Sequence, residues 1–346
     1  MKFKSLLFLI LFITLFDIAV RAQSPDVQLT QLRSNFANRY LQPDSHFSLA
    51  KYYLEHGQPV QAFYILEYAR HYRFEEPDFD KAFIKFFGDP MPEPPDDAKV
   101  DFKKASDLVA QQKLDEAEAL FRTAYSGYDR SFFINAWIGR FYYKAKTDPA
   151  RALPFYFKSY FLYPHAYETE FVESRIRKIT VEDAQTDFRS LRKDGKPLSE
   201  LVRNPNPLIV SMALEEMASK WAPEYLSPVV YATTNDESSV RWQAFMMIQK
   251  LAGSERDKIV NEMLAGADLR KRGLAAYAVI ERPGPEKFET LKKMLTEPSE
   301  LLRFDAASAL AMKGGETGKQ ILRQHQPTEK QLRLKELIVR VLKGEA

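Results

Sequence analysis

The chain has 346 residues, of which 45% are apolar and 13% aromatic, so it can bury a substantial core, and disorder is not the expected state. Its 50 basic and 47 acidic side chains nearly balance, which argues against nucleic-acid binding, because nucleic-acid binders carry a basic excess. Cysteine is absent from the sequence, and this excludes disulfides, thiolate metal sites, thiol catalysis and a lipid-modified N-terminal cysteine.

The first 22 residues have the pattern of a secretory signal peptide. Lys2 and Lys4 precede an apolar run from Leu6 to Phe16, and Val20-Arg21-Ala22 follows as the cleavage site. The run is about 11 residues long, whereas a membrane-spanning helix needs roughly 20. We therefore expect export to the periplasm or the exterior, with a bacterial envelope favoured and no transmembrane helix in the mature chain. An uncleaved N-terminal anchor is the alternative.

Three similar helix pairs are expected between residues 44 and 164, each with small residues where the two helices approach. In the third pair the turn between the helices has one extra residue. The key positions are Ala50, Tyr53, Gly57, Ala62, Leu66 and Ala69; Ala105, Leu108, Gln112, Ala117, Phe121 and Ala124; and Gly139, Tyr142, Ala152, Tyr156, Ser159 and Pro164. This pattern resembles the tetratricopeptide repeat, a 34-residue helix pair. The stretch from Lys113 to Phe121 is the best match.

The first and second pairs are too far apart in sequence to stack directly. An extra helix from Phe79 to Phe87 is expected in this gap, followed by a proline-rich insert near residues 89–97. Four prolines in six positions favour an extended, solvated segment over a helix. A surface connector is the preferred interpretation, and a docking segment for a proline-binding module is the alternative.

The resemblance to tetratricopeptide repeats implies a concave face, lined by the first helix of each pair, that holds partner peptides. On that template Lys51, Glu55, Arg140 and Lys144 would project into the groove. The same charges would also suit any solvated helix face. Tyrosine and phenylalanine are crowded in this half, and their helical spacing favours core packing, with an aromatic groove for a sugar or a base as the alternative.

The second half of the chain carries a 31-residue period. Four alanines recur at this interval, an apolar residue follows each alanine after four positions, and another follows after sixteen, so each unit is expected to form two helices. The alanines are Ala213, Ala244, Ala275 and Ala306. The period begins near Leu198, and a unit from Leu332 to Leu342, shifted by one residue, is expected to close the stack.

Arg241, Arg272 and Arg303 share the phase of this period. Segments such as 240–244 and 302–310 resemble HEAT repeats of the short type found in phycobilin lyases. Acidic residues precede the arginines, and we expect them to cap the first helices and to pair with arginines of neighbouring repeats. These are Asp236, Asp268 and Glu300. An arginine ladder that binds an anionic partner is the alternative.

A search for catalytic motifs yields none. The five histidines, at positions 46, 56, 71, 165 and 325, lack the spacing of zinc ligands, and each is interpreted as a surface or capping residue. Residues 314–319 resemble a phosphate-binding loop, but Lys313 replaces its first glycine and Gln320 its Ser/Thr. We therefore predict no catalytic residues, no metal and no cofactor.

The sequence thus predicts an all-α solenoid of helical hairpins, with a signal peptide at 1–22, a tetratricopeptide-like domain at 23–178 and a HEAT-like domain at 179–346. The expected function is that of a non-enzymatic scaffold or adaptor whose concave surface binds a protein of the cell envelope. The alternatives are a carbohydrate- or peptidoglycan-binding module and, less favoured, an enzyme like the lyases. The identity of the partner and the oligomeric state stay open.

Overall fold

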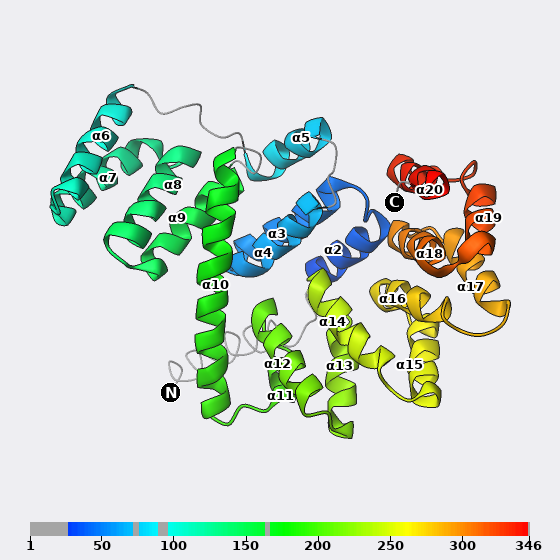
Figure 1. The fold of residues 1–346 in the computed structure, drawn as a ribbon. Coiled ribbons are helices and arrows are strands. Elements are labelled where there is room, and N and C mark those ends of the chain that lie inside the picture. The colour runs from blue at the N-terminus through cyan, green and yellow to red at the C-terminus, as the bar shows by residue number, and fades with distance from the viewer. Residues whose placement is uncertain (1–26, 72–75, 89–95, 163–166, 345–346) are drawn as a thin grey trace, which may run out of the picture.

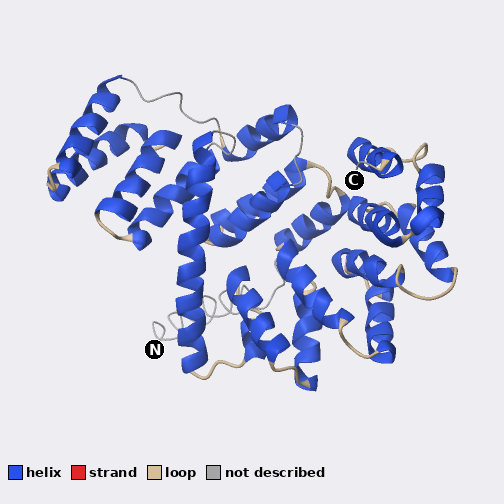
Figure 2. Cartoon of the chain, viewed as in Figure 1, coloured by secondary structure: helices blue, strands red, loops and turns tan. Residues whose placement is uncertain are grey.

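A computed structural model describes residues 27–71, 76–88, 96–162 and 167–344. The predicted signal peptide and residues 89–95 of the proline-rich insert lie outside these ranges. The described residues form helices joined by short loops and no strand, as Figure 2 shows, so the predicted all-α class is confirmed. None of these helices is both long and apolar enough to cross a membrane.

The N-terminal half contains the predicted helix pairs, each of which packs as a hairpin (Figure 1). The extra helix, expected from Phe79, begins at Glu76 as α5. The helices of this half are α2 (Val27–Asn38), α3 (Pro43–Glu55), α4 (Pro59–His71), α5 (Glu76–Phe87), α6 (Asp96–Ala110), α7 (Leu114–Tyr128), α8 (Phe132–Arg140), the π-helix η1 (Phe141–Ala145) and α9 (Pro149–Leu162). Ala62, Ala117 and Ala152 are fully buried where the paired helices approach.

The extra residue of the third pair is accommodated in a π-helical turn. The backbone N–H of Lys146 donates to the carbonyl of Phe141, five residues earlier, at 3.2 Å, and η1 continues α8 without a break in the helical path. A π-turn holds one residue more than an α-turn, so the insertion widens the end of α8 and leaves the hairpin intact.

Gly139 on α8 lies close against α9 in this third pair. A Cβ atom at this position would lie 2.8 Å from two ring carbons of Tyr156, whose side chain is fully buried on α9. We expect Gly139→Ala to destabilise the protein by about 1–3 kcal/mol, even though alanine favours helix by about 1 kcal/mol. Gly127→Ala on α7, where nothing lies within 4 Å, is the matched control and should be neutral or stabilising. Equal effects of the two variants in urea denaturation would contradict this packing.

The 31-residue period maps onto consecutive helix pairs in the C-terminal half. The elements are α10 (Tyr167–Lys193), α11 (Leu198–Leu201), α12 (Pro207–Ser219), the 3-10 helix η2 (Pro223–Tyr225), α13 (Leu226–Ala232), α14 (Ser238–Gln249), α15 (Gly253–Ala265), α16 (Leu269–Val279), α17 (Glu286–Leu295), α18 (Glu300–Lys313), α19 (Gly315–His325) and α20 (Leu332–Lys343). Ala213, Ala244, Ala275 and Ala306 all have 0% exposure, which confirms their predicted role in close helix packing.

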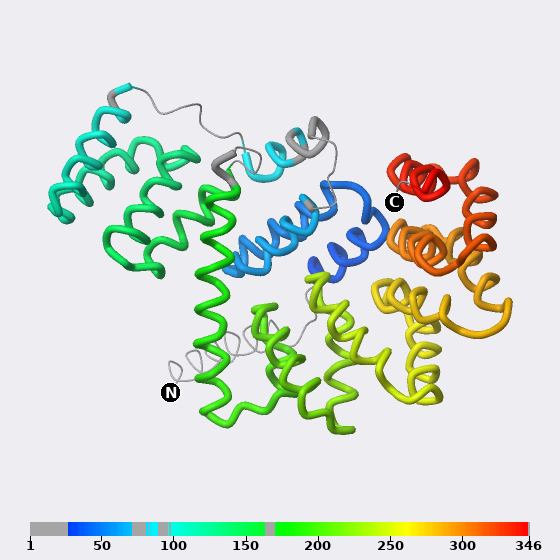
Figure 3. The backbone as a smooth tube through the Cα atoms, viewed as in Figure 1, coloured from blue at the N-terminus to red at the C-terminus, as the bar shows by residue number. Residues whose placement is uncertain are grey.

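The two halves are joined by α10, which packs on α9 and on α12. The predicted domain boundary at residues 178/179 falls inside this helix, and Figure 3 shows its backbone running without interruption from one half to the other. A single long helix thus sets the relative position of the two sets of hairpins.

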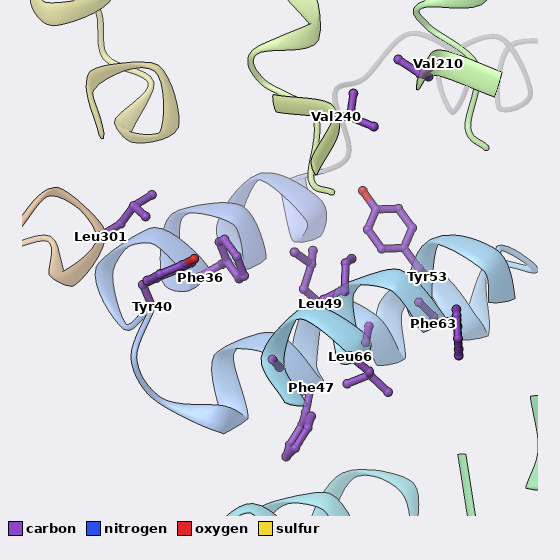
Figure 4. Close-up of a cluster of buried hydrophobic side chains, with 14 of the residues drawn as sticks. Phe36, Tyr40, Phe47, Leu49, Tyr53, Phe63, Leu66, Val210, Val240 and Leu301 are labelled. Atoms are coloured by element: carbon purple, nitrogen blue, oxygen red, sulfur yellow. The ribbon is translucent and has the colours of Figure 1, made fainter. Parts of the chain in front are cut away.

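The C-terminal repeats curve around the hairpin that α2 and α3 form, which we call the N-terminal hairpin. In Figure 1, α2 and α3 lie inside the arc formed by α10 to α20, and α2 packs on α16 and α18. Figure 4 shows Phe36 of α2 and Tyr53 of α3 beside apolar side chains of the repeats, among them Val240 and Leu301. All four side chains are buried. The inner face of the repeats is therefore covered by a segment of the same chain.

Candidate functional site

The arginines of the 31-residue period have structural partners. Arg272 forms an ion pair with Glu297, and Arg303 lies 3.0 Å from Glu329, each in the loop that leads to the following repeat. Pairing between repeats is thus confirmed for these two arginines, although their partners are Glu297 and Glu329 and none of the three predicted carboxylates. It is wrong for Arg241, which is 4% exposed and donates to the backbone carbonyls of the preceding loop at 2.8 and 2.9 Å.

One of the three predicted acidic caps is confirmed. The Asp268 carboxylate accepts backbone N–H groups in the first turn of α16. Asp236 and Glu300 are not caps, because Glu237 and Ser299 cap α14 and α18. The predicted cap lies one residue before the observed cap at α14 and one residue after it at α18. Several polar side chains in a loop before a helix can accept the free N–H groups of the first turn, so the sequence does not fix which one does.

These two carboxylates instead hold the N-terminal hairpin. Asp236, with 3% of its side chain exposed, accepts hydrogen bonds from the Arg33 guanidinium at 2.6 and 2.8 Å, from Arg270 at 2.5 Å and from the Tyr53 hydroxyl. Glu300 accepts a hydrogen bond from the backbone N–H of Leu41 at 3.0 Å and another from the side-chain amide of Gln42 at 2.9 Å. Polar anchors thus add to the apolar contacts that keep the inner face of the repeats covered.

The four residues predicted to line a partner groove are not brought together. Lys51 and Glu55 form an exposed pair at 3.9 Å on α3. Arg140 and Lys144 lie side by side on α8 and η1, where they line a cleft of about 590 Å³ between α6 and α8. We call this cleft the α6–η1 groove. It is lined by Lys99, Phe102, Lys103, Ser106, Val109, Phe121, Trp137, Arg140, Phe141, Lys144 and Ala145.

The floor of the α6–η1 groove is aromatic. The ring of Phe102 lies 4.7 Å from Trp137 and 5.2 Å from Phe121, which in turn lies 4.9 Å from Phe141. The phenylalanines are 4–5% exposed, whereas Trp137 is 38% exposed. The indole therefore presents an apolar surface to the groove on a rigid base, and we treat the groove as the candidate site.

The rim of the groove is cationic, and three of its four cations have no ion-pair partner among the described residues. Within the described ranges, no ion pair involves Lys103, Arg140 or Lys144, and no carboxylate lines the groove. Lys99 pairs with Asp96, which is fully exposed, at 3.6 Å. The sequence reasoning missed Lys99 and Lys103. Their spacing with Phe102 and Ser106 places all four on one face of α6, and this pattern could have revealed them.

Arg151 of α9 and Lys146, which directly follows η1, are neutralised by an acidic residue of α7. Glu118 on α7 accepts hydrogen bonds from Arg151 at 2.6 Å and from the Tyr142 hydroxyl at 3.0 Å, and Lys146 lies 3.3 Å away. Desolvation opposes ionisation, but these donors hold the pKa of Glu118 down at about 2. Arg151 and Lys146 thus have an acidic partner, whereas Lys103, Arg140 and Lys144 of the groove have none among the described residues.

A second, more polar cleft of about 710 Å³ lies where α4, α10 and the start of α14 meet. Arg177 pairs with Glu67 and Glu173, and Arg70 pairs with Glu173. Burial raises the pKa of Glu67, as does its hydrogen bond with Glu173, while Arg177 opposes the shift. The lining residues are Tyr64, Glu67, Tyr68, Arg70, Glu170, Glu173, Arg177, Glu237 and Ser239.

Among the described residues, His46 departs from its interpretation as a surface or capping residue. His46 is 1% exposed, and its Nε2 lies 2.7 Å from the carbonyl oxygen of Tyr40. Its ring packs 4.7 Å from Phe36. Among the described residues, no cluster of histidine, aspartate and glutamate is arranged to hold a metal ion.

The chain was compared with known proteins in three ways. Neither protein-family models, nor curated proteins, nor solved structures give a match. Function must therefore be inferred from the geometry of the molecule itself.

Proposed function

We propose that this protein is an exported, non-enzymatic scaffold that binds a partner protein of the cell envelope through the α6–η1 groove. The proposal rests on one observation. The inner face of the C-terminal repeats is covered by α2 and α3, whereas the groove between α6 and α8 is accessible and presents the exposed indole of Trp137. Open concave faces of helical solenoids are suited to holding extended or helical segments of other proteins.

The groove has the composition of an interaction hot spot. Trp137 is an exposed aromatic anchor on a buried aromatic base, and Arg140 lies one helical turn away on the same face of α8. Tryptophan and arginine contribute most to binding at protein interfaces, because they bury large areas while keeping directed polar contacts.

A steric block tests this proposal without changing any charge. Ser106 is exposed within the groove, so Ser106→Trp should fill the space and prevent binding of any occupant. We expect the immobilised wild-type protein to retain a specific protein from envelope extract and the variant to lose it. Capture that is equal for both proteins would contradict the use of this groove.

Export is tested separately. The mature protein, purified from the envelope fraction of expressing cells, should begin at Gln23, directly after the predicted cleavage site. An unprocessed chain that stays in the cytoplasmic fraction would contradict export and leave the test of the groove unaffected.

Carbohydrate binding is the second candidate, and the central cleft between α4, α10 and α14 favours it. Its carboxylates, guanidinium groups and the Tyr64 and Tyr68 rings form a set that can hydrogen-bond sugar hydroxyls and pack on a sugar face. Soluble peptidoglycan fragments should then bind wild-type protein in calorimetry and bind Arg70→Ala more weakly. Absence of any heat of binding to wild-type protein would remove this candidate.

A further inference from the structure

We infer that the α6–η1 groove receives an acidic segment of the partner protein that carries one aromatic or branched aliphatic side chain. This inference rests on the proposed function and adds to it the chemistry of the bound segment. Three features carry it: the free cations of the rim, the exposed indole of the floor and the length of the groove.

The free cations determine the charge of the occupant. Lys103 stands on α6, and Arg140 and Lys144 stand on α8 and η1, so the cations line both long sides of the groove. A like-charged or neutral segment placed between them would leave these cations without partners as water is displaced, whereas an acidic segment would neutralise them. Arginine also binds carboxylates through two parallel hydrogen bonds.

The floor determines the apolar part of the occupant. Trp137 belongs to α8, and its ring lies 4.7 Å from Phe102 of α6 and 6.3 Å from Phe133. Because its neighbours hold the indole in place, an aromatic or branched aliphatic side chain can pack on it without the entropic cost of immobilising the indole.

The groove also limits the length of the occupant. The lining residues of α6 run from Lys99 to Val109, and at 1.5 Å per residue this distance is about 15 Å. About five extended residues span it. The bound segment is therefore a short linear motif in a tail or loop of the partner. The groove is long enough to make all of the contacts with such a motif.

The same features argue against an anionic lipid surface and a neutral sugar. The buried phenylalanines of the floor are 4–5% exposed and lie below the rim, so they cannot enter a flat membrane surface. A neutral sugar is held by acceptors as well as donors, and no carboxylate lines this groove within the described residues.

The experiment uses the full-length mature protein and a labelled peptide of about six residues, made of glutamate and aspartate around one phenylalanine. Fluorescence anisotropy should show saturable binding that weakens as salt is raised, because salt screens exposed charges. The double variant Lys103→Glu/Arg140→Glu should bind at least about tenfold more weakly. Lys113→Glu, at the exposed turn between α6 and α7, should change the affinity by less than about twofold.

Two further comparisons test the apolar contact. A peptide in which alanine replaces the phenylalanine should bind several-fold more weakly, and Trp137→Phe, which keeps an aromatic ring, should lose less affinity than Trp137→Ala. Circular dichroism should show that all variants stay helical. Trp137 fluorescence should change on binding in the wild type, and the change should be absent in Trp137→Phe.

Several outcomes would overturn the inference. These are equal binding of a lysine version of the peptide, binding unaffected by the double variant, or binding of phosphatidylglycerol vesicles with no binding of the peptide. If Ser106→Trp abolishes capture of an envelope protein while the double variant retains it, the inference fails and the proposed function stands. If neither variant affects capture, both fail.

Discussion

Asp236→Ala is expected to lower the free energy of unfolding by about 3–5 kcal/mol, the largest effect among the variants considered. The carboxylate has 3% of its surface exposed and accepts hydrogen bonds from Arg33, Arg270 and Tyr53. Its removal takes away one of the two counter-charges of the Arg270 guanidinium, whose side chain is 10% exposed and which then keeps only Asp268 at 2.8 Å. Breaking one side of a buried ion pair is costly because the remaining charge has already lost its hydration.

Urea denaturation of two further variants identifies the origin of this loss. Arg33→Ala should cost less than Asp236→Ala, because Arg33 is 38% exposed and its loss leaves the other partners of Asp236 in place. The double variant should lose less than the sum of the two single variants, as expected for residues in direct contact. Glu200→Ala, which breaks the exposed pair with Lys196, should be nearly neutral. An Asp236→Ala loss as small as that of Glu200→Ala would contradict the anchoring role.

The second large effect is a loss of stability in acid that arises from His46. Burial lowers the pKa of this imidazole from 6.5 to about 4, against the opposing influence of its hydrogen bond to the Tyr40 carbonyl. The folded state therefore binds the proton less readily than the unfolded state. The stability that this provides is fully present above pH 6.5 and is lost as the pH falls toward 4. This lowering of the pKa from 6.5 to about 4 corresponds to about 3 kcal/mol between pH 7 and pH 4.

His46→Gln isolates this contribution, because glutamine can donate to the same carbonyl but does not titrate. Other titratable groups also change the free energy of unfolding between pH 7 and pH 4. Burial raises the pKa of Asp305 to about 7, and this effect has the opposite sign, because its protonated form is favoured in the folded state. The measured quantity is therefore the difference in unfolding free energy between wild type and variant. It should shift by about 3 kcal/mol in favour of the variant from pH 7 to pH 4. A difference that is independent of pH would contradict the buried neutral imidazole.

The position of His46 gives its protonation a specific consequence. Tyr40 and Phe36 pack against this ring, and Tyr40 also packs on Phe304 of α18 at 5.6 Å. Charging the imidazole thus weakens the site where the N-terminal hairpin meets the C-terminal repeats. Hydrogen exchange should accordingly show that α2 loses protection in acid before α12 does.

Only two of the four groove residues predicted from the sequence line the candidate site. Arg140 and Lys144 were predicted from the template of a helical repeat, and both line the α6–η1 groove. Lys51 and Glu55 were predicted from the same template but pair with each other elsewhere. Equivalent positions in a regular repeat share a surface only when consecutive helix pairs stack directly. Here α5 and the 89–97 segment separate the first pair from the second along the chain, so the template could not be extended across them.

The sequence by itself determined the helix pairs and their buried positions. A 31-residue period with alanines at Ala213, Ala244, Ala275 and Ala306 specifies close packing between each pair and the next, and all four are fully buried. Such contacts are local and repeated, so they leave a periodic signal. Only the tertiary structure decided that α2 and α3 cover the inner face of these repeats. The contact of Arg33 with Asp236 joins residues 203 positions apart, and a single long-range ion pair leaves no period in the chain. Together with the packing of α2 on α16 and α18, that contact covers the inner face of the repeats, whereas the α6–η1 groove stays accessible.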